Sequence, residues 1–511
     1  MIDRPLEIPP RSGDVLLVPA GAALLDLARQ NRARLDEERR PLAGVPLGEI
    51  RRRARADALA LGRAYTADAD LAASPGGDLL LLTGHQPVFA HPGIWAKYLL
   101  LDRLAARGGA GLAVVVDSDE MEEVGADVPT YAGGSLARRR EVLQRPEPDE
   151  PYEGQPAPTA QAWAEFLARI DRHIATLPEE AIRRAWAGFR AGSPPPVASL
   201  TAFILALRRR YERPRHFLDV PISTLAETES FRAFFLHIAA EAESFRAIHN
   251  RRLEAYREQQ HVRTEAQPFP NLEDGPRGIE LPFWSVAEGR RRRVFLDPDA
   301  RTLHGAGTDP VALPADPGDP VFAALRLRPR AMTLTAFLRL LVADLFIHGV
   351  SGGRYDRVTD AVCADFFQVA PPAYAVASAT LHLPFRAAGN PEERERLQRL
   401  IQESRHNPER LLAEPTAEQQ AVIAEKWRLI RRLKEGTLSR RARRALTQEI
   451  RALNERLSVP LAPRLAALEA RLAALDDRGP GEAATYRGYP FFLYQREEVE
   501  ALVTKMLAGG I

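Results

Sequence analysis

A polar loop that follows an apolar run has residue types suited to anion binding and to acid–base chemistry. Thr83-Gly84-His85-Gln86-Pro87 comes directly after the apolar run Asp78–Thr83. A glycine at a strand end lets a ligand approach the backbone closely, and the helix predicted to begin near Ile94 offers free N–H groups to a phosphate or carboxylate. His85 and His91 could polarise, protonate or ligate a substrate. A plain strand-to-helix turn with surface histidines is the alternative interpretation.

A second cluster, which is acidic, follows the apolar run Leu112–Val116. Asp117-Ser118-Asp119-Glu120 brings three carboxylates together. Carboxylates at a strand end can bind a metal, accept ribose hydroxyl groups or act as a general base. They are also common as helix caps and as solvated loop charges. If the strand continues through the cluster, Asp117 and Asp119 share one face and Glu120 points to the other.

Two further groups could bind an anion. His348-Gly349 and Gly352-Gly353 belong to a glycine-rich bend between two predicted helices, where the N-terminus of the second helix could receive a phosphate. Arg328, which precedes Pro329, could bind a phosphate or carboxylate through two hydrogen bonds. A helix–helix turn with glycine caps and a structural ion pair are the respective alternatives.

Several kinds of site are not predicted. His85 and His91 lie six residues apart across a loop, a spacing that matches no standard metal-ligand motif, so no metal site is expected. Cys363 is the only cysteine, which excludes an intrachain disulfide and a multi-thiolate metal site. Its place on the apolar face of a predicted helix indicates a small buried side chain.

The first two clusters must be positioned by a strand–helix–strand unit. Asp78–Thr83 and Leu112–Val116 read as buried strands, and the helix between them begins near Ile94 and contains Trp95, Leu99 and Leu104 at helical spacing. Such a crossover predicts parallel strands, whose carboxyl ends meet at one edge of the sheet. Ligands bind at that edge in open α/β sheets, so we expect both clusters to share one crevice.

The remaining elements predict an α/β protein with helical insertions. Further core strands are expected at Asp14–Val18 and His216–Ile222, and a hairpin around Glu288-Gly289. Helices are expected at Ala22–Leu61, Gln161–Glu212, Glu227–Arg257, Leu334–Phe346, Asp356–Phe367 and Glu497–Leu507. The aromatic stretch Tyr486–Tyr494 is expected to form a short return strand.

A charged stretch near the C-terminus predicts an antiparallel coiled-coil hairpin. Leucine and isoleucine residues recur at spacings of three and four in two groups, Leu446, Ile450, Leu453 and Leu457, and then Leu465, Leu468, Leu472 and Leu475. An earlier apolar strip, with Gly436 between it and these groups, supplies the partner arm, and Pro460 should interrupt the second arm. The expected domains are a core over 1–385 with connecting insertions at about 146–260, a coiled-coil hairpin over 386–480 and a returning segment over 481–511.

Composition narrows the function classes. The 70 Lys and Arg nearly balance the 68 Asp and Glu, giving a formal net charge of +2, which predicts no nucleic-acid partner. The apolar runs are too short to cross a bilayer and the first residues lack an apolar signal core, so we expect a cytoplasmic protein with no membrane partner.

The order of these features resembles that of the cysteine-adding enzymes, or cysteine ligases, of bacillithiol biosynthesis. Thr83-Gly84-His85-Gln86 resembles their TGQQ segment, Asp117-Ser118-Asp119-Glu120 stands at their EDHD motif, and Leu327-Arg328-Pro329 resembles their LRP segment. Gly352-Gly353 resembles the start of their GGP turn. His85 and Ser118 depart from the family's residues at those positions, and Arg354 stands in place of the proline, so the resemblance is to a divergent member.

The resemblance implies a Rossmann-like core, a coiled coil that pairs two subunits, and a nucleotide such as ATP or ADP as a cofactor. It implies a ligase that joins cysteine to a glucosaminyl-malate acceptor. On this hypothesis, Gly84, Gln86 and the following helix hold an anionic group, and His85, His91 or Asp119 handles a proton. The other candidates orient a sugar or neutralise an anion, namely Asp117, Glu120, Arg328, His348, Gly352 and Gly353.

Two alternatives remain open from the sequence. The segment His91-Pro92-Gly93 before a helix resembles the HxGH signature of nucleotidyltransferases, which would make the protein a nucleotidyl-transferring or metal-assisted enzyme. A non-catalytic dimeric scaffold is expected instead if the side chains of His85, Asp117 and Arg328 lie far apart.

Overall fold

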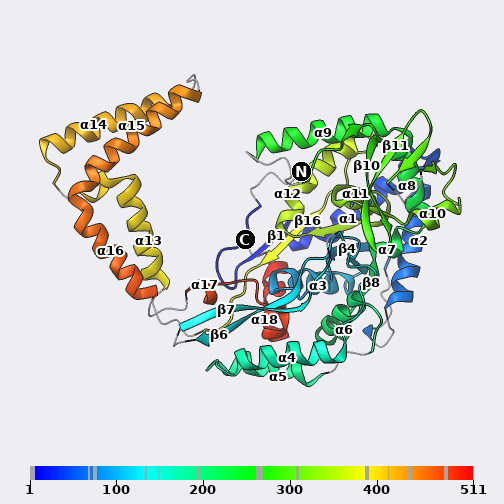
Figure 1. Cartoon of the computed structure of the whole chain (residues 1–511), viewed down its shortest axis with the longest axis horizontal. Coiled ribbons are helices and arrows are strands. Elements are labelled where there is room, and N and C mark those ends of the chain that lie inside the picture. Colours follow the sequence, from blue (N-terminus) through cyan, green and yellow to red (C-terminus); the bar gives the residue numbers. More distant parts are fainter. Residues whose placement is uncertain are drawn as a thin grey trace. The chain divides into compact units, whose positions relative to one another are not determined.

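A computed structural model describes residues 6–66, 70–72, 77–132, 135–147, 149–192, 196–260, 269–305, 310–385, 391–412, 414–434, 440–476 and 481–509 (Figure 1). The chain divides into two compact units. The first comprises Met1–Val128, Arg138–Leu383 and Arg487–Ile511, and the second comprises Pro129–Ala137 and Pro384–Tyr486. The second unit therefore includes the expected 386–480 segment and also a short piece of chain around residue 133, which the sequence did not assign to it. No helix in the described part of the chain is long and apolar enough to span a bilayer.

The first unit is built on a six-stranded sheet in the order β1-β16-β15-β4-β5-β8. Its strands are β1 (Val15–Val18), β4 (Leu79–His85), β5 (Gly109–Val115), β8 (Phe217–Pro221), β15 (Leu345–His348) and β16 (Ala375–Ala379). All neighbours pair in parallel except β1, which is antiparallel to β16. The strands predicted in the sequence at β1, β4, β5 and β8 are confirmed.

Two helical crossover connections move in opposite directions across this sheet. Helix α3 (Pro92–Ala105) leads from β4 to β5, and α12 (Val350–Asp365) leads from β15 to β16 on the other side. The strand order therefore reverses between β4 and β15, and this boundary is a topological switch point. Leu80, Leu82 and Leu112 share a core cluster with residues of α12, which shows how alternate strand residues bury one face of the sheet.

The helix expected at Ala22–Leu61 is two helices, α1 (Leu24–Asp36) and α2 (Leu47–Tyr65). Between them lies a hairpin of β2 (Pro41–Leu42) and β3 (Val45–Pro46). Its turn requires positive φ at Ala43 and Gly44, 50° and 80°, a conformation that no helix can contain. The two prolines at its edges also lack the N–H group that a continuous helix needs.

The segment expected as a helix over Leu334–Phe346 changes structure twice. Helix α11 (Ala331–Phe337) passes into a π-helical turn, η3 (Leu338–Val342), and the chain then becomes strand β15. Asp344 explains the change, because its Oδ2 accepts the backbone N–H of Leu80 at 2.6 Å and its Oδ1 pairs with Arg51 at 2.5 Å. These bonds hold the chain beside β4, and the single-helix prediction was wrong.

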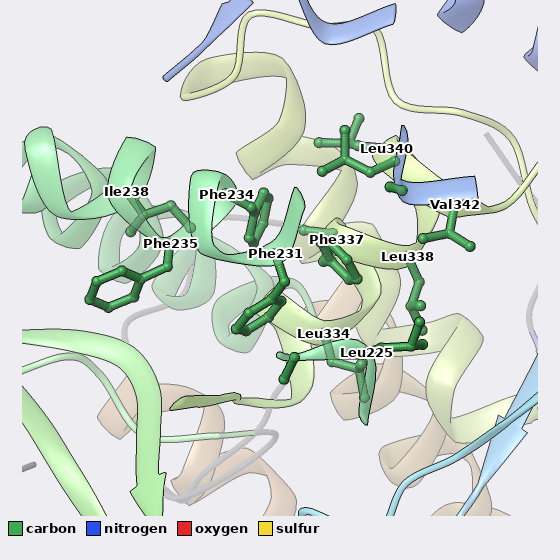
Figure 2. Packing of buried hydrophobic residues seen from close by; sticks show 14 of the residues in the cluster. Leu225, Phe231, Phe234, Phe235, Ile238, Leu334, Phe337, Leu338, Leu340 and Val342 are labelled. Atoms are coloured by element: carbon green, nitrogen blue, oxygen red, sulfur yellow. The ribbon is translucent and has the colours of Figure 1, made fainter. Parts of the chain in front are cut away.

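A phenylalanine-rich face fills the core beside this segment (Figure 2). Phe231, Phe234 and Phe235 of α8 (Glu229–Ala240) recur at helical spacing and are fully buried. The ring of Phe337 lies 5.2 Å from that of Phe231 and 5.6 Å from that of Phe234, both edge-on. This packing joins α8 to α11 and fixes the base from which β15 departs.

A second, antiparallel sheet contains the predicted hairpin around Glu288-Gly289. Its order is β13-β12-β11-β10-β14, with β9 paired to β10. The strands are β9 (Asp274–Gly275), β10 (Gly278–Ala287), β11 (Arg290–Asp297), β12 (Thr302–His304), β13 (Val311–Ala312) and β14 (Leu327–Pro329). A separate pair is formed by β6 (Val124–Ala132) and β7 (Ser135–Gln144). The remaining helices of this unit are α4 (Ala160–Ile174), α5 (Glu180–Ala191), α6 (Leu200–Glu212), α7 (Ile222–Leu225), α9 (Ala242–Gln259), α10 (Val321–Leu325) and α18 (Arg496–Leu507).

The second unit is helical. Its helices are α13 (Pro391–His406), α14 (Ala417–Lys434), α15 (Arg440–Ser458), α16 (Ala462–Asp476) and α17 (Gly481–Ala484). Helix α14 packs against α15, and α13 packs against α16. The chain is interrupted at Val459–Leu461, where Pro460 was expected to break the second arm. Gly436, the predicted turn, lies outside the described residues.

The return strand expected at Tyr486–Tyr494 is absent from the described residues of that segment, which form a 3-10 turn at Phe491–Leu493 instead. Phe491 donates its backbone N–H to the carbonyl of Ala90 at 2.7 Å. Its ring packs 5.7 Å from that of Trp95 on α3. The aromatic residues thus fasten this segment to α3 by side-chain packing rather than by pairing along a sheet edge.

Candidate functional site

A cavity of about 310 Å³ lies at the switch point of the parallel sheet. It is lined by the carboxyl ends of β4 and β15 and by the first residues of α3 and α12. The sequence-predicted residues that line it are Gly84, His85, His91, His348 and Gly352. Open α/β sheets bind ligands at this position because the crossover helices diverge there and leave a crevice.

The end of β4 brings backbone and imidazole groups to the cavity. A side chain at Gly84 would put its Cβ 3.0 Å from the carbonyl oxygen of Val114, so the close pairing with β5 favours glycine. His85 has its Nδ1 3.2 Å from the carbonyl oxygen of Gln86. Burial, helped by the charge of Lys97, lowers the pKa of His85 to about 3, so this imidazole is neutral near pH 7.

His91 forms the cap of helix α3. Its Nδ1 accepts the backbone N–H of Gly93 at 3.0 Å, and Pro92 occupies the first helical position. Burial, together with the charge of Arg487, lowers the pKa of His91 to about 3. The neutral cap orients the first turn of α3, whose Gly93 and Ile94 line the cavity.

Helix α12 begins at the cavity without a side-chain cap. Its N-cap is Gly349, which has no side chain to bond the first N–H groups, and Val350, Ser351 and Gly352 line the cavity. The expected bend at Gly352 is therefore the first turn of a helix, not a connection between two helices. The N–H groups of such a turn and the helix dipole favour an anion.

Lys97 and Arg487 are cationic side chains among the described residues that line the cavity. Neither was predicted from the sequence as a site residue. Lys97 is 4% exposed and donates from Nζ to the carbonyl oxygen of Gly84 at 3.1 Å. Burial lowers its pKa to about 8, so its ammonium group remains mostly charged at pH 7. Arg487 donates from Nη2 to the carbonyl oxygen of Ala379 at 3.0 Å. No aspartate or glutamate is among the described residues that line the cavity.

The acidic cluster lies beside the loop after β4 but does not line the cavity. Asp119 accepts a hydrogen bond from Nε2 of Gln86 at 2.7 Å, so the two predicted clusters do meet at one edge of the sheet. Arg291 lies 3.3 Å from Asp119 and 2.6 Å from Glu120. Both carboxylates therefore share one arginine of the second sheet, which offsets only part of their charge.

Asp117 also points away from the cavity. Its carboxylate accepts the backbone N–H of Ser223 at 3.0 Å and the hydroxyl of Ser223 at 2.5 Å. Burial raises the pKa of Asp117 to about 6, against the opposing effect of these hydrogen bonds. The two clusters do not share the expected crevice, because the acidic residues bond to α7 and to the second sheet while the cavity opens between β4 and β15.

Arg328 has the ion-pair role that was its alternative interpretation. Its Nε and Nη2 bond the two carboxylate oxygens of Glu153 at 2.7 and 2.9 Å, and its Nη1 bonds Glu227 at 2.8 Å. Gly353 lies in α12 but faces the sheet, since a Cβ there would sit 2.4 Å from Cγ2 of Val376. Neither residue lines the cavity.

Among the described residues, no group of three or more histidine, cysteine, aspartate and glutamate side chains is placed to hold a metal ion. The thiol of Cys363 is buried on α12, and burial raises its pKa to about 12. Comparison with protein-family models and with curated proteins gave no match.

Proposed function

We propose that the protein is a group-transfer enzyme of the carbon–nitrogen ligase type, which holds an anionic part of its substrate in the switch-point cavity. One observation carries the proposal. Two helices, α3 and α12, begin at the cavity, and Lys97 and Arg487 line it without any carboxylate among the described lining residues. The first N–H groups of the uncapped helix α12, two helix dipoles and two cations all favour the same kind of ligand, whereas the first N–H groups of α3 are bonded to His91.

The size of the cavity limits what it can hold. At about 310 Å³ it is at the lower end of the range for small-molecule sites, enough for a phosphate group or a small carboxylate with a few further atoms. A nucleotide would place its phosphates against the first turns of α3 and α12 and extend its remaining parts toward solvent. Gly84 and Gly352 would let those parts approach the backbone closely.

The ligation chemistry rests on the resemblance to the cysteine-adding enzymes. Cysteine and a glucosaminyl-malate acceptor both carry carboxylates, which the cationic cavity would attract. On this proposal the parallel sheet is a Rossmann-like core, ATP or ADP is a candidate cofactor, and the protein acts in the cytoplasm. The coiled coil that would join two subunits is the segment in which α14 packs against α15 and α13 packs against α16 within one chain.

A nucleotidyltransferase is the second candidate, because His91-Pro92-Gly93 caps α3 at the cavity as a nucleotide-binding helix start would require. The two candidates differ in their partial reactions. A nucleotidyltransferase exchanges labelled pyrophosphate into ATP in the presence of its acceptor. A ligase that needs no adenylated intermediate forms its amide product without that exchange.

The proposal is tested by titrating the full-length protein with inorganic phosphate, ADP, ATP and cysteine in a calorimeter. We expect phosphate or a nucleotide to bind the wild type and to bind Lys97→Met at least tenfold more weakly. Lys505→Met, which removes a half-exposed lysine of α18, is the matched control and should bind as the wild type does. Mass spectrometry then looks for a cysteine adduct of glucosaminyl-malate. If none of the four ligands binds the wild type, the proposal fails.

A further inference from the structure

His348 stands at the cavity with a carboxylate behind it. The residue ends strand β15, is 4% exposed and lines the cavity. Its Nε2 lies 2.8 Å from Oδ2 of Asp356, which is itself 2% exposed and belongs to α12. The other ring nitrogen faces the first turn of that helix, because a Cβ at Gly352 would sit 3.0 Å from Nδ1 of His348.

Glycine at position 352 keeps this nitrogen open. A larger residue would place its side chain against Nδ1, at a contact closer than ordinary van der Waals distance. Gly352 and His348 both line the cavity, so the space that a side chain would fill is available to a ligand. Nδ1 is therefore the ring nitrogen through which His348 can reach a bound molecule.

The carboxylate behind the imidazole is held in its charged form. Arg339, which is 1% exposed, bonds Oδ2 of Asp356 at 2.5 Å and Oδ1 of Asp360 at 2.6 Å. Burial works against the charge of Asp356, yet Arg339 and His348 together hold the pKa of this carboxyl well below its usual range. The carboxylate oxygen lies 2.8 Å from Nε2 but is not aligned for a hydrogen bond, so its negative charge is what favours the tautomer with the proton on Nε2 and a lone pair on Nδ1.

The ring is also fixed by packing. The ring of Phe346 lies 4.4 Å from that of His348, and the ring of Tyr374 lies edge-on at 5.1 Å. The guanidinium of Arg339 stacks over Tyr374 at 4.6 Å, which ties the arginine to the same group. These contacts restrict rotation of the imidazole, as a residue that transfers protons at a defined atom requires.

We propose that His348 is the general base of the group transfer, and that Asp356 is its positioning residue. This inference rests on the proposed function, since it needs a nucleophile in the same cavity. The lone pair of Nδ1 takes the proton of the attacking amine as its nitrogen forms a bond to the carbonyl carbon of an acyl phosphate. The carbon–oxygen bond to phosphate then breaks, the phosphate departs with the bonding electrons, and the imidazolium returns the proton to it. Asp356 stabilises the transient positive charge and is not itself protonated.

The two other histidines of the cavity do not suit this role. Nδ1 of His91 accepts the N–H of Gly93 as the cap of α3, so this lone pair is already occupied. Burial lowers the pKa of both His85 and His91 to about 3, which makes each a weak base near pH 7. Among the described residues, His85 contacts the carbonyl oxygen of Gln86 and His91 accepts the N–H of Gly93, and neither ring is paired with a carboxylate as His348 is with Asp356.

The tautomer is tested by nitrogen NMR of the full-length protein labelled in histidine, with His348→Gln to identify the signal. We expect Nε2 to be protonated and Nδ1 to be unprotonated, and inorganic phosphate to shift the Nδ1 resonance. The chain offers a matched control in His173 of α4, whose Nε2 lies 2.8 Å from Glu141 of β7, outside the cavity. Phosphate should leave the His173 signal in place. A proton on Nδ1 of His348, or an unmoved Nδ1 when phosphate binds, overturns the inference.

Kinetics separates catalysis from structure. With any substrate pair that the wild type joins, His348→Gln and Asp356→Asn should each lower kcat at least a hundredfold and leave KM within about threefold. Glu141→Gln should change neither constant. His348→Gln keeps the Asp356–Arg339 pair and serves if Asp356→Asn does not fold. If none of phosphate, ADP, ATP and cysteine binds, the proposed function fails, whereas a normal rate for His348→Gln in an active enzyme refutes the base alone.

Discussion

Replacing Lys97 with methionine removes a buried ammonium group and keeps an apolar stem of similar length. In the wild type the ammonium group of Lys97 is almost fully buried, and burial lowers its pKa from 10.5 to about 8. That difference corresponds to about 3 kcal/mol, since each pKa unit is worth about 1.4 kcal/mol. The hydrogen bond from Nζ to the carbonyl of Gly84 returns about 1 kcal/mol of this cost. We therefore expect Lys97→Met to raise the free energy of unfolding by about 1–3 kcal/mol at pH 7.

The sign of the pH dependence follows from the same pKa. Below about pH 8 the lysine is charged in both the folded and the unfolded chain, so its unfavourable contribution is fully present. Between about pH 8 and 10.5 the unfolded chain binds more protons than the folded one, and the wild type gains stability relative to the variant. The difference between Lys97→Met and the wild type should therefore shrink as the pH rises through this interval.

Urea unfolding at pH 7 and at pH 10, followed by tryptophan fluorescence, measures this effect. A Trp427→Phe background removes the tryptophan of the second unit, so the signal reports the unit that contains Lys97. Lys505→Met, which has a half-exposed side chain, should show no such change with pH. A variant that is destabilised equally at both pH values would refute the claim that a desolvated ammonium lies in the cavity. The same variant should lose anion binding. The buried ammonium group of Lys97 would then lower the stability of the fold and serve to bind the anion.

Three further outcomes are expected. Arg328→Met should lower the free energy of unfolding by about 3–5 kcal/mol in urea, because the buried carboxylate of Glu153 keeps only its longer contact with the half-exposed Arg326; phosphate affinity should stay within twofold, and a large loss would mean that the arginine contacts ligand. Gly353→Ala should cost about 1–3 kcal/mol in a thermal unfolding experiment, since its Cβ would collide with Val376; an unchanged Tm would contradict that packing. The pKa of Asp117 is raised by burial from 3.8 to about 6, so the folded state loses stability as the pH rises between these values. Asp117→Asn should remove about 3 kcal/mol of that pH dependence in unfolding titrations, and an identical pH profile would refute it.

The strands that flank the first crossover could be predicted from the sequence, because their apolar runs end at glycine or at a polar cluster. Leu79–His85 and Gly109–Val115 are buried on both faces, and such strands read as continuous apolar segments. Strand β15 could not be recognised in the same way. Its four residues follow a leucine-rich helix without a turn signal, and the change depends on Asp344 bonding to Leu80, far away in the sequence.

Missing β15 had a direct consequence for the site. Without β15, the sequence placed only β5 beside β4. The loop after Thr83 was therefore expected to face the acidic cluster that follows β5. The true switch point lies on the other side of β4, so His348 and Gly352 join the cavity and Asp117 does not. The role of Arg328 likewise depended on Glu153, whose proximity only the fold creates.

The burial of Lys97 could have been predicted from its neighbours in the sequence. It lies in the segment Ile94–Leu101, whose other residues are apolar or aromatic, and a lysine there must be buried or must break the pattern. Arg487 had no comparable signal, because it reaches the cavity from the last part of the chain. Residue types could thus indicate an anion site at the end of β4, but its cations came from tertiary structure.

The central claim is that the carboxyl ends of β4 and β15 form an anion site between the first turns of α3 and α12. The most direct measurement is a crystal structure of the full-length protein grown with ADP. The account predicts phosphate density against the N–H groups of Ser351 and Gly352, within hydrogen-bonding distance of Nζ of Lys97. ADP bound elsewhere, for example beside Arg354 and Tyr355, with no anion at the switch point, would contradict it.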